Sequence, residues 1–488
     1  MATESSTQDA NKPPTLARTM GLGALIIYGV GDMLGAGVYG LIGKTAGQMG
    51  NAVWLAFVTA MFAALFTGLS YASLGSRYPR AGGVAFVTQR AFGMPFLSYV
   101  IGLAVVASGL TSFATGARAF AGYLDAYIND GKFASDVTNV PLWIIGGYVV
   151  FLTLVNLRGM KESTWMNALC TFIEVVGLAI VIVVGLKYWG GVDLLAVPQT
   201  VVATGNEAVD AAAQKAALEN LTGSLSLSLA LQGAILTFYS FLGFEDLMNV
   251  SEEVKNPQRN FPRGVIIALL ITTVIYIVVA ITAVSVLSPA ELAASKQPLV
   301  DVVAKAAPAF PSWLFSLIAL FAIANTGLLN YIMGSRLIYG MARQGLMPKF
   351  LATIHPKRRT PHWAILILGV IVLMLALSMD VRQLASATST LLLTVFIIVN
   401  LSLIVLQRKP DEAKGQFEIP WIVPALGILI CVAILSQVKP DTSKGIPDFL
   451  RDPRLVAGAI IAFIAALYFV IKPKNITEDA LSEAAHNE

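Results

Sequence analysis

Apolar segments about as long as a bilayer is thick recur along the whole chain. They lie near residues 21–43, 52–75, 95–124, 141–157, 164–187, 225–250, 263–287, 312–340, 363–380, 384–407, 419–437 and 454–472. A helix of about 20 residues crosses the hydrocarbon core of a membrane, and these runs are too long for the short alternating strands of a membrane β-barrel. The sequence therefore predicts an all-α polytopic membrane protein with twelve transmembrane helices.

The composition supports the same class. Hydrophobic residues make up 56% of the 488 residues and charged residues only 13%, whereas soluble domains are about 25% charged. Cys170 and Cys431 both lie in apolar runs, so neither a disulfide framework nor a metal site is expected. The net charge of +4 is scattered over short connections instead of forming one face, so we expect no nucleic-acid partner.

Lysine and arginine cluster after every second apolar run. Representatives are Arg77, Arg158, Lys255, Arg358 and Lys409, whereas the alternate connections carry mixed or acidic charge. Short basic connections stay in the cytoplasm. We therefore expect a multi-pass protein of the cytoplasmic membrane with both termini inside, residues 130 and 210 outside the cell, and residues 256 and 358 inside.

Two of the runs do not suit a continuous helix. The first has glycines at 29, 31, 35, 37 and 40 around Asp32, and in the sixth Gly243 is followed by Glu245 and Asp246. Glycine in a helix interior costs up to about 1 kcal/mol relative to alanine, so helix breaks are predicted. Close packing against a neighbouring helix is the alternative reason for such glycines.

The two interrupted runs are the first and the sixth, which is the spacing of two five-helix repeats. Inverted repeats of this kind place a binding site between their broken first helices. We expect repeats near 18–190 and 222–408 and two further helices near 418–472. This transporter domain, 18–472, would be flanked by cytoplasmic tails at 1–17 and 473–488.

Three ordered motifs resemble the amino acid, polyamine and organocation superfamily of permeases. They are Gly31 to Tyr39 in the first run, Phe238 to Pro257 in the sixth run and its exit, and Ser335 to Pro348 after the eighth run. The resemblance covers roughly residues 18–472. It implies two inverted five-helix repeats plus two helices, and alternating access around a site in the middle of the membrane.

The resemblance also implies where substrate binds. Backbone amides of Gly35, Ala36 and Gly37 would bind a carboxylate, carbonyls of the sixth run would bind an ammonium group, and Tyr239 or Phe241 would form an aromatic lid. The complete expected substrate-binding set is Asp32, Gly35, Ala36, Gly37, Tyr239, Ser240, Phe241, Leu242 and Phe244.

Acidic residues within apolar runs are candidates for coupling, because a charge at membrane depth costs about 2.5–3.5 kcal/mol on insertion scales. Asp32 is expected in or near the site, with a purely structural role as the alternative. Glu174 is a candidate for coupling, although some members of the superfamily carry lysine at what resembles this position. Glu245 would couple or gate, or would brace the kink.

The nature of the coupling stays open among protons, sodium and exchange. Protons or exchange are favoured, because the middle of the eighth run offers only Asn325 and Thr326 where sodium coupling in this fold typically needs paired hydroxyls. Glu252, Glu253 and Arg259 after the sixth run are either interfacial charges or a gate that pairs with Arg77 or Arg80.

These features together predict a secondary transporter of an amino acid or a related amine. A nucleotide-binding P-loop and a catalytic or metal-binding constellation are not found in the sequence, so no enzyme activity, catalytic residue or cofactor is expected. The alternatives are a polyamine permease, a transporter-like sensor that binds without flux, and, less well supported, a channel. The expected partners are the substrate, the lipid bilayer and, for proton coupling, protons.

Overall fold

The structure is a computed structural model of the chain. It describes residues 18, 20–79, 83–128, 142–199, 207–295, 297–378, 381–412, 414–437, 452–471 and 473. The predicted tail at 1–17, nearly all of the tail at 473–488, and residues 80 and 130 lie outside these described residues.

Helices and their connections make up the described chain, and two isolated β-bridges are its only strand-like pairing. Eight helical segments are long and apolar enough to cross a membrane, and four shorter apolar helices accompany them. The long helices include α3 (Val53–Arg77), α5 (Pro95–Ile128), α7 (Met160–Gly185), α10 (Pro257–Val286), α13 (Ser312–Arg343), α15 (Val381–Arg408) and α18 (Pro453–Ile471). The shorter ones are α1 (Leu22–Met33), α6 (Leu142–Arg158), α14 (His362–Ser378) and α16 (Ile422–Ser436). The all-helical membrane class is confirmed, and the count of twelve and the inverted repeats stay predictions.

Large apolar side chains cover the outside of the bundle. Phe172 on α7, Val274 on α10, Leu429 on α16 and Phe463 on α18 are each more than 60% exposed. Large exposed apolar surfaces mark sites of contact with a membrane or with another protein. The outer faces of these helices are therefore suited to contact lipid.

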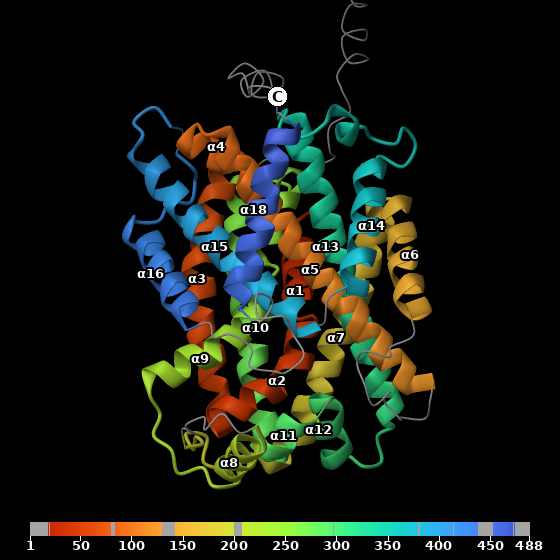
Figure 1. The fold of residues 1–488 in the computed structure, drawn as a ribbon, viewed down its shortest axis with the longest axis vertical. Helices are drawn as coiled ribbons and strands as arrows, with labels where there is room; N and C mark the ends of the chain where they lie inside the picture. Colours follow the sequence, from red (N-terminus) through yellow and green to blue (C-terminus); the bar gives the residue numbers. More distant parts are fainter. Residues whose placement is uncertain are drawn as a thin grey trace, which may run out of the picture.

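The bundle has an inner group and an outer group of helices. The broken first segment, α1 with α2 (Ala36–Met49), packs on α3, α7, α10 and α13, and α9 (Leu227–Phe238) packs on α2 and α3. In Figure 1, α6 and α14 lie at one edge and α16 lies at the opposite edge. The two interrupted segments are therefore held by neighbouring helices rather than by lipid.

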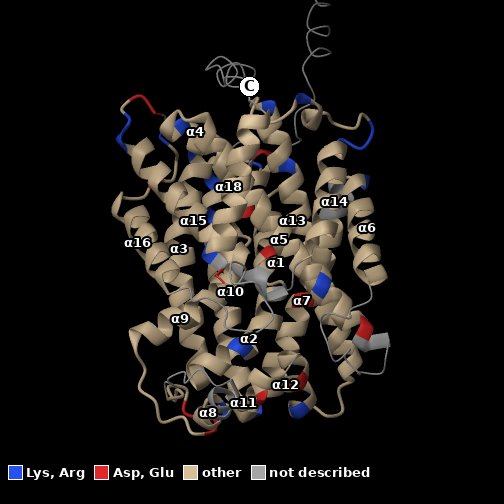
Figure 2. Cartoon of the chain, in the orientation of Figure 1, with Lys and Arg blue, Asp and Glu red and all other residues tan. Residues whose placement is uncertain are grey.

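Short helices mark the two ends of the bundle. The helices α8 (Glu207–Glu219), α11 (Pro289–Ala294) and α12 (Pro298–Ala306) lie at one end, and α4 (Gly83–Phe92) lies at the other (Figure 1). The stretch between the apolar runs at 164–187 and 225–250 was expected to be a connection, and it holds α8. Figure 2 shows lysine and arginine concentrated at the α4 end, which we name the basic end.

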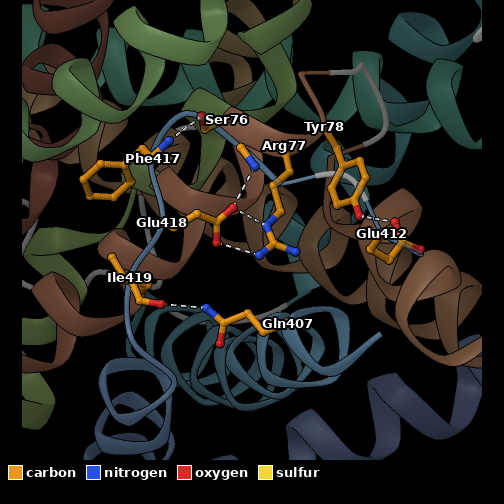
Figure 3. Close-up of polar contacts among 9 residues, drawn as sticks. Ser76, Arg77, Tyr78, Gln407, Glu412, Phe417, Glu418 and Ile419 are labelled. Atoms are coloured by element: carbon orange, nitrogen blue, oxygen red, sulfur yellow. Dashed lines mark hydrogen bonds and ion pairs between the residues drawn. The ribbon is translucent and has the colours of Figure 1, made fainter. Parts of the chain in front are cut away.

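The connection between α15 and α16 crosses the basic end and is tied to α3 (Figure 3). Arg77 forms a two-pronged ion pair with Glu418, at 2.8 and 2.5 Å, and the Oγ of Ser76 accepts a hydrogen bond from the Phe417 amide at 3.2 Å. Tyr78 donates to Glu412 at 2.5 Å. Burial, followed by this hydrogen bond, raises the pKa of Tyr78, so its phenol remains a donor.

Some of these contacts involve residues that were considered for a gate. Arg77 pairs with Glu418 instead of with Glu253, and Arg259 donates to Gln416 at 2.9 Å. Glu253 forms a buried ion pair with Arg336 of α13 at 3.1 Å. The partners of Arg77 and Arg259 therefore come from the distant α15–α16 connection, and a gate that uses Arg80, which lies outside the described residues, stays a prediction.

Candidate functional site

The first apolar segment breaks in the middle of the bundle. Helix α1 ends at Met33 and α2 begins at Ala36, with Leu34 and Gly35 between them. The ψ angle of Gly35 is −147°, which is outside the helical range. The first amides of α2 have no partner within the helix and carry its positive dipole end, so the break creates a place for negative charge.

The sixth segment breaks in a comparable way. Helix α9 ends at Phe238, a short 3-10 turn covers Tyr239–Phe241, and a second 3-10 helix, η6, runs from Phe244 to Glu253. Gly243 between them has φ of 126°, which L side chains rarely adopt. The Gly243 amide donates to the Glu245 carboxylate at 2.9 Å. Glu245 therefore braces the kink, which is the structural role that the sequence left open.

The two breaks pack directly against each other. A methyl group on Gly37 would lie 2.6 Å from the Ser240 Cα, and one on Gly243 would lie 2.9 Å from Asp32 atoms. The hydroxyl of Tyr276 on α10 lies within hydrogen-bond distance of the Met33 and Ser240 carbonyls, so it can donate to either one at a time. Glycine is required at positions 37 and 243 because a side chain at either position would collide with the opposite break.

A cavity lies where the two breaks meet. Its empty volume is about 410 Å³, including the solvent at its mouth. The lining residues come from both breaks and from α5, α13 and α15. They are Asp32, Met33, Gly35, Gly37, Ser108, Ser112, Tyr239, Leu242, Gly243, Glu245, Asp246, Thr326, Asn330, Met333, Thr388 and Leu392.

Three acidic side chains lie together in this cavity. Asp32, Glu245 and Asp246 are each at least 96% buried, and they lie close enough to interact electrostatically. One carboxylate oxygen of Asp32 and one of Asp246 have no hydrogen-bond partner among the described residues. No lysine or arginine is among the described residues that line the cavity. Enclosed negative charge without a positive partner is costly, so the cavity suits a cationic group.

The structure brings some of the expected site residues to the cavity and places others elsewhere. Asp32, Gly35, Gly37, Tyr239 and Leu242 line it, together with Glu245. Ala36 starts α2, and the Cα of Ser240 lies against Gly37. The phenol of Tyr239 meets Ser112 at 3.2 Å.

The two phenylalanines of the expected set belong to the core. Phe241 is fully buried and packs between Phe57 and Tyr276, with ring centroids 6.5 and 5.3 Å away. Phe244 packs on Tyr71 and Phe396 at 5.7 and 5.3 Å. Of the two aromatic residues considered as a lid, Tyr239 is therefore the one at the cavity.

Several lining residues were not assigned to the substrate site from the sequence, and one of them, Thr326, was considered there only as a sodium ligand. Ser108 and Ser112 lie one turn apart on α5, Thr326 and Asn330 lie one turn apart on α13, and Thr388 lies on α15. Polar residues four apart in an apolar helix mark one face of that helix. This spacing was a usable signal in α5 and α13, whereas Thr388 lies in a stretch rich in hydroxyl residues, 386–390, in which spacing does not single it out.

Glu174 lies in a separate polar cluster beside the first break. It is fully buried on α7, and the Asn325 amide of α13 lies near its carboxylate, although neither carboxylate oxygen completes a hydrogen bond among the described residues. Asn325 also donates to the Gly31 carbonyl and to Thr171, both at 3.2 Å. The cluster therefore joins α1, α7 and α13 at the point where α1 approaches its break.

The comparisons with known proteins agree on one family. The profile of the amino acid permease family matches residues 21–449. A branched-chain amino acid permease of Bacillus subtilis is 25% identical over 446 residues, which cover 87% of this chain and 89% of that protein. A methylthioribose transporter of the same bacterium is 28% identical over 451 residues, with 88% and 91% covered. The mouse cationic amino acid transporter 4 is 28% identical over 412 residues, with 82% and 61% covered.

Proposed function

Because this chain belongs to the amino acid permease family, whose members are transporters and not enzymes, we propose that it carries an amino acid across the cytoplasmic membrane by alternating access. The observation that supports this most directly is the cavity between two broken helices. Such breaks supply free amides and carbonyls in the middle of a membrane protein, where a substrate can replace water as their partner.

The two ends of an amino acid fit different walls of the cavity. The amides that begin α2, near Gly35 and Gly37, would bind the substrate carboxylate. The ammonium group would lie near Asp32 and the carbonyls of the second break, with the Tyr239 ring over it. Closure of the breaks around the substrate would then shield it from one side of the membrane.

The charge of the lining favours a cationic amino acid or amine as substrate. Three carboxylates exceed the single positive charge of an ammonium group, so a second positive group on the substrate would find a partner among them. A neutral amino acid is the competing substrate class. One relative is named as a transporter of methylthioribose, which is a substrate of another class.

We assign the coupling role to the polar cluster around Glu174. Its carboxyl group is buried next to the first break, so a change in its protonation would act on the element that must move. Proton coupling or exchange therefore fits this chain better than sodium coupling.

Purified protein in proteoliposomes tests the function. Vesicles preloaded with unlabelled lysine, arginine, leucine or putrescine would be exposed to trace labelled lysine, and counterflow above that of empty liposomes is expected, strongest with lysine or arginine inside. Imposed proton and sodium gradients then separate the coupling modes. Binding of the same compounds without counterflow would show a sensor, and flux without saturation would show a channel; either result contradicts the proposal.

A further inference from the structure

A second cavity lies at the basic end, apart from the substrate cavity. It is formed by the end of α6, the last turns of α13 and the connection from α13 to α14, and its empty volume is about 390 Å³. The two cavities share no lining residue. Substrate binding in the cavity between the two helix breaks does not account for this second cavity.

Hydrogen bonds hold the three elements around this cavity together. Tyr331 of α13 donates to the Ile365 carbonyl of α14 at 2.6 Å and meets Thr153 of α6 at 3.0 Å. Thr360, which lines the cavity, donates to the Leu157 carbonyl at 3.4 Å. The cavity is therefore built into the packing of these helices.

Two buried donors on the cavity wall lack acceptors. The Nη1 of Arg336 and the Nδ2 of Asn156 have no hydrogen-bond partner among the described residues, and the two residues are 5% and 4% exposed. The ion pair of Arg336 with Glu253 uses Nη2 and leaves Nη1 unused. Because an unpaired buried donor is unfavourable, both groups suit a ligand that brings acceptor atoms.

Arg359 adds a second guanidinium at the mouth of the cavity. Its φ is 52°, and it is one of two non-glycine residues with positive φ in the described chain. The turn is fixed by hydrogen bonds from the Arg359 amide to the His355 carbonyl at 2.8 Å and from the His355 amide to the Thr360 carbonyl at 2.9 Å. Arg358 is also exposed, but it does not line the cavity.

We propose that this cavity binds an oxyanion, either a phosphate or a carboxylate group. Among the described residues, the lining holds two arginines and no acid, so one positive charge remains there after Arg336 is paired with Glu253. Guanidinium groups suit both oxyanions because they donate two parallel hydrogen bonds. The remaining wall is largely apolar, with Ile332, Ile354 and Pro361, so it also accommodates a ligand with an apolar part.

The oxyanion could come from a lipid headgroup or from a soluble anion. The neighbouring helices α6 and α14 expose Phe151, Leu154, Val370 and Met374, each at least 50% accessible, so lipid can approach the cavity along them. Basic pockets between helices on the cytoplasmic side are known to bind anionic headgroups. The binding experiment must therefore separate the two sources.

The test measures thermal stability of the purified, delipidated full-length protein in detergent. Short-chain phosphatidylglycerol is titrated against phosphatidylcholine of the same chain length, and inorganic phosphate or acetate is titrated against chloride at equal ionic strength. Saturable stabilisation by an oxyanion above its control is expected. A response to phosphatidylglycerol alone assigns the site to lipid, and an equal response to free phosphate or acetate assigns it to a soluble anion.

Two variants and a matched control decide whether the cavity is responsible. Arg359→Gln should weaken the apparent affinity about tenfold, the effect of losing one charge-assisted hydrogen bond, whereas Arg358→Gln removes the same charge one residue away and should change it little. Asn156→Leu should also weaken binding. If that variant does not fold, the comparison of Arg359→Gln with Arg358→Gln still tests the proposal. Equal losses in the two arginine variants, or no saturable response to any oxyanion, would overturn the proposal.

Discussion

Asp32 allows a test of the charge preference of the proposed site, because one of its buried carboxylate oxygens has no hydrogen-bond partner among the described residues. We predict that Asp32→Asn weakens a cationic ligand such as lysine by roughly ten- to hundredfold, since charge-assisted hydrogen bonds contribute about 1.5–3 kcal/mol. A neutral ligand such as leucine should be spared. Ligand-induced thermal shifts on both proteins measure the two affinities.

The control for this prediction is Asp411→Asn, the same chemical change at an exposed position in the α15–α16 connection. It should leave both ligands unaffected. If Asp32→Asn weakens lysine and leucine alike and lowers the unfolding temperature without ligand, then Asp32 only holds the broken helix.

Glu174 is predicted to act in coupling, because a fully buried acid beside the first break is costly unless it has a task. Glu174→Gln keeps the shape of the side chain and removes its titration. Uptake by the variant in proteoliposomes should lose most of its dependence on external pH, while lysine binding changes less than about threefold. An unchanged pH profile would make Glu174 structural.

Glu291 offers a test of pH dependence outside the membrane-spanning helices. Its carboxylate accepts a hydrogen bond from the Ser288 amide at 2.8 Å at the start of α11, and this bond, helped by Lys305, lowers the pKa of Glu291. A pKa lowered on folding gives stability above the unfolded value of about 4.3, and this stability is lost as the pH falls through the folded value.

Wild-type protein should therefore lose more thermal stability between pH 5 and pH 3 than Glu291→Gln does. The difference should be small because the pair is exposed to solvent. Glu219→Gln, which changes an exposed acid at the end of α8, should follow the wild-type curve. Parallel curves for wild type and Glu291→Gln would contradict the prediction.

At the scale of elements, the α15–α16 connection is predicted to stabilise the basic end through Arg77 and Glu418. The Arg77 side chain is 4% exposed and that of Glu418 31%, so their two-pronged ion pair is only partly screened. We expect a coupling of about 1 kcal/mol in a double-mutant cycle of Arg77→Gln and Glu418→Gln. Chemical unfolding in detergent measures the cycle.

The matched control is the ion pair between Arg454 and Asp452, two positions apart, in which the arginine side chain is 47% exposed and the aspartate side chain 18%. A cycle of Arg454→Gln and Asp452→Asn should give a coupling near zero. If the two cycles give the same coupling, then the α15–α16 connection adds no stability beyond that of an ordinary surface pair.

At the scale of the whole molecule, the segregation of charge predicts the orientation in the membrane. The basic end should face the cytoplasm, because short basic connections are retained there. In a background without Cys170 and Cys431, Arg358→Cys and Asn256→Cys should resist an impermeant thiol reagent in intact cells, and Asp210→Cys in α8 should react. Permeabilised cells supply the control for reactivity. Labelling of positions 358 and 256 together with protection of position 210 would show that the orientation is the opposite one.

The sequence by itself determined the class of the protein and the position of its helices and breaks. Apolar runs near 263–287 and 312–340 correspond to α10 and α13, and the glycines around Asp32 and Gly243 coincide with the two interruptions. These features are local, because membrane burial needs a continuous apolar segment and helix breaks need residues without a Cβ.

Only the tertiary structure decided which side chains meet. Phe241 and Phe244 turned to the core, Ser112 and Asn330 joined the cavity from other helices, and Arg77 paired with Glu418 across 341 positions. The rotation of each helix and the path of each connection depend on how all the helices pack together. A residue's own sequence neighbourhood does not contain that information, since its partners come from distant parts of the chain.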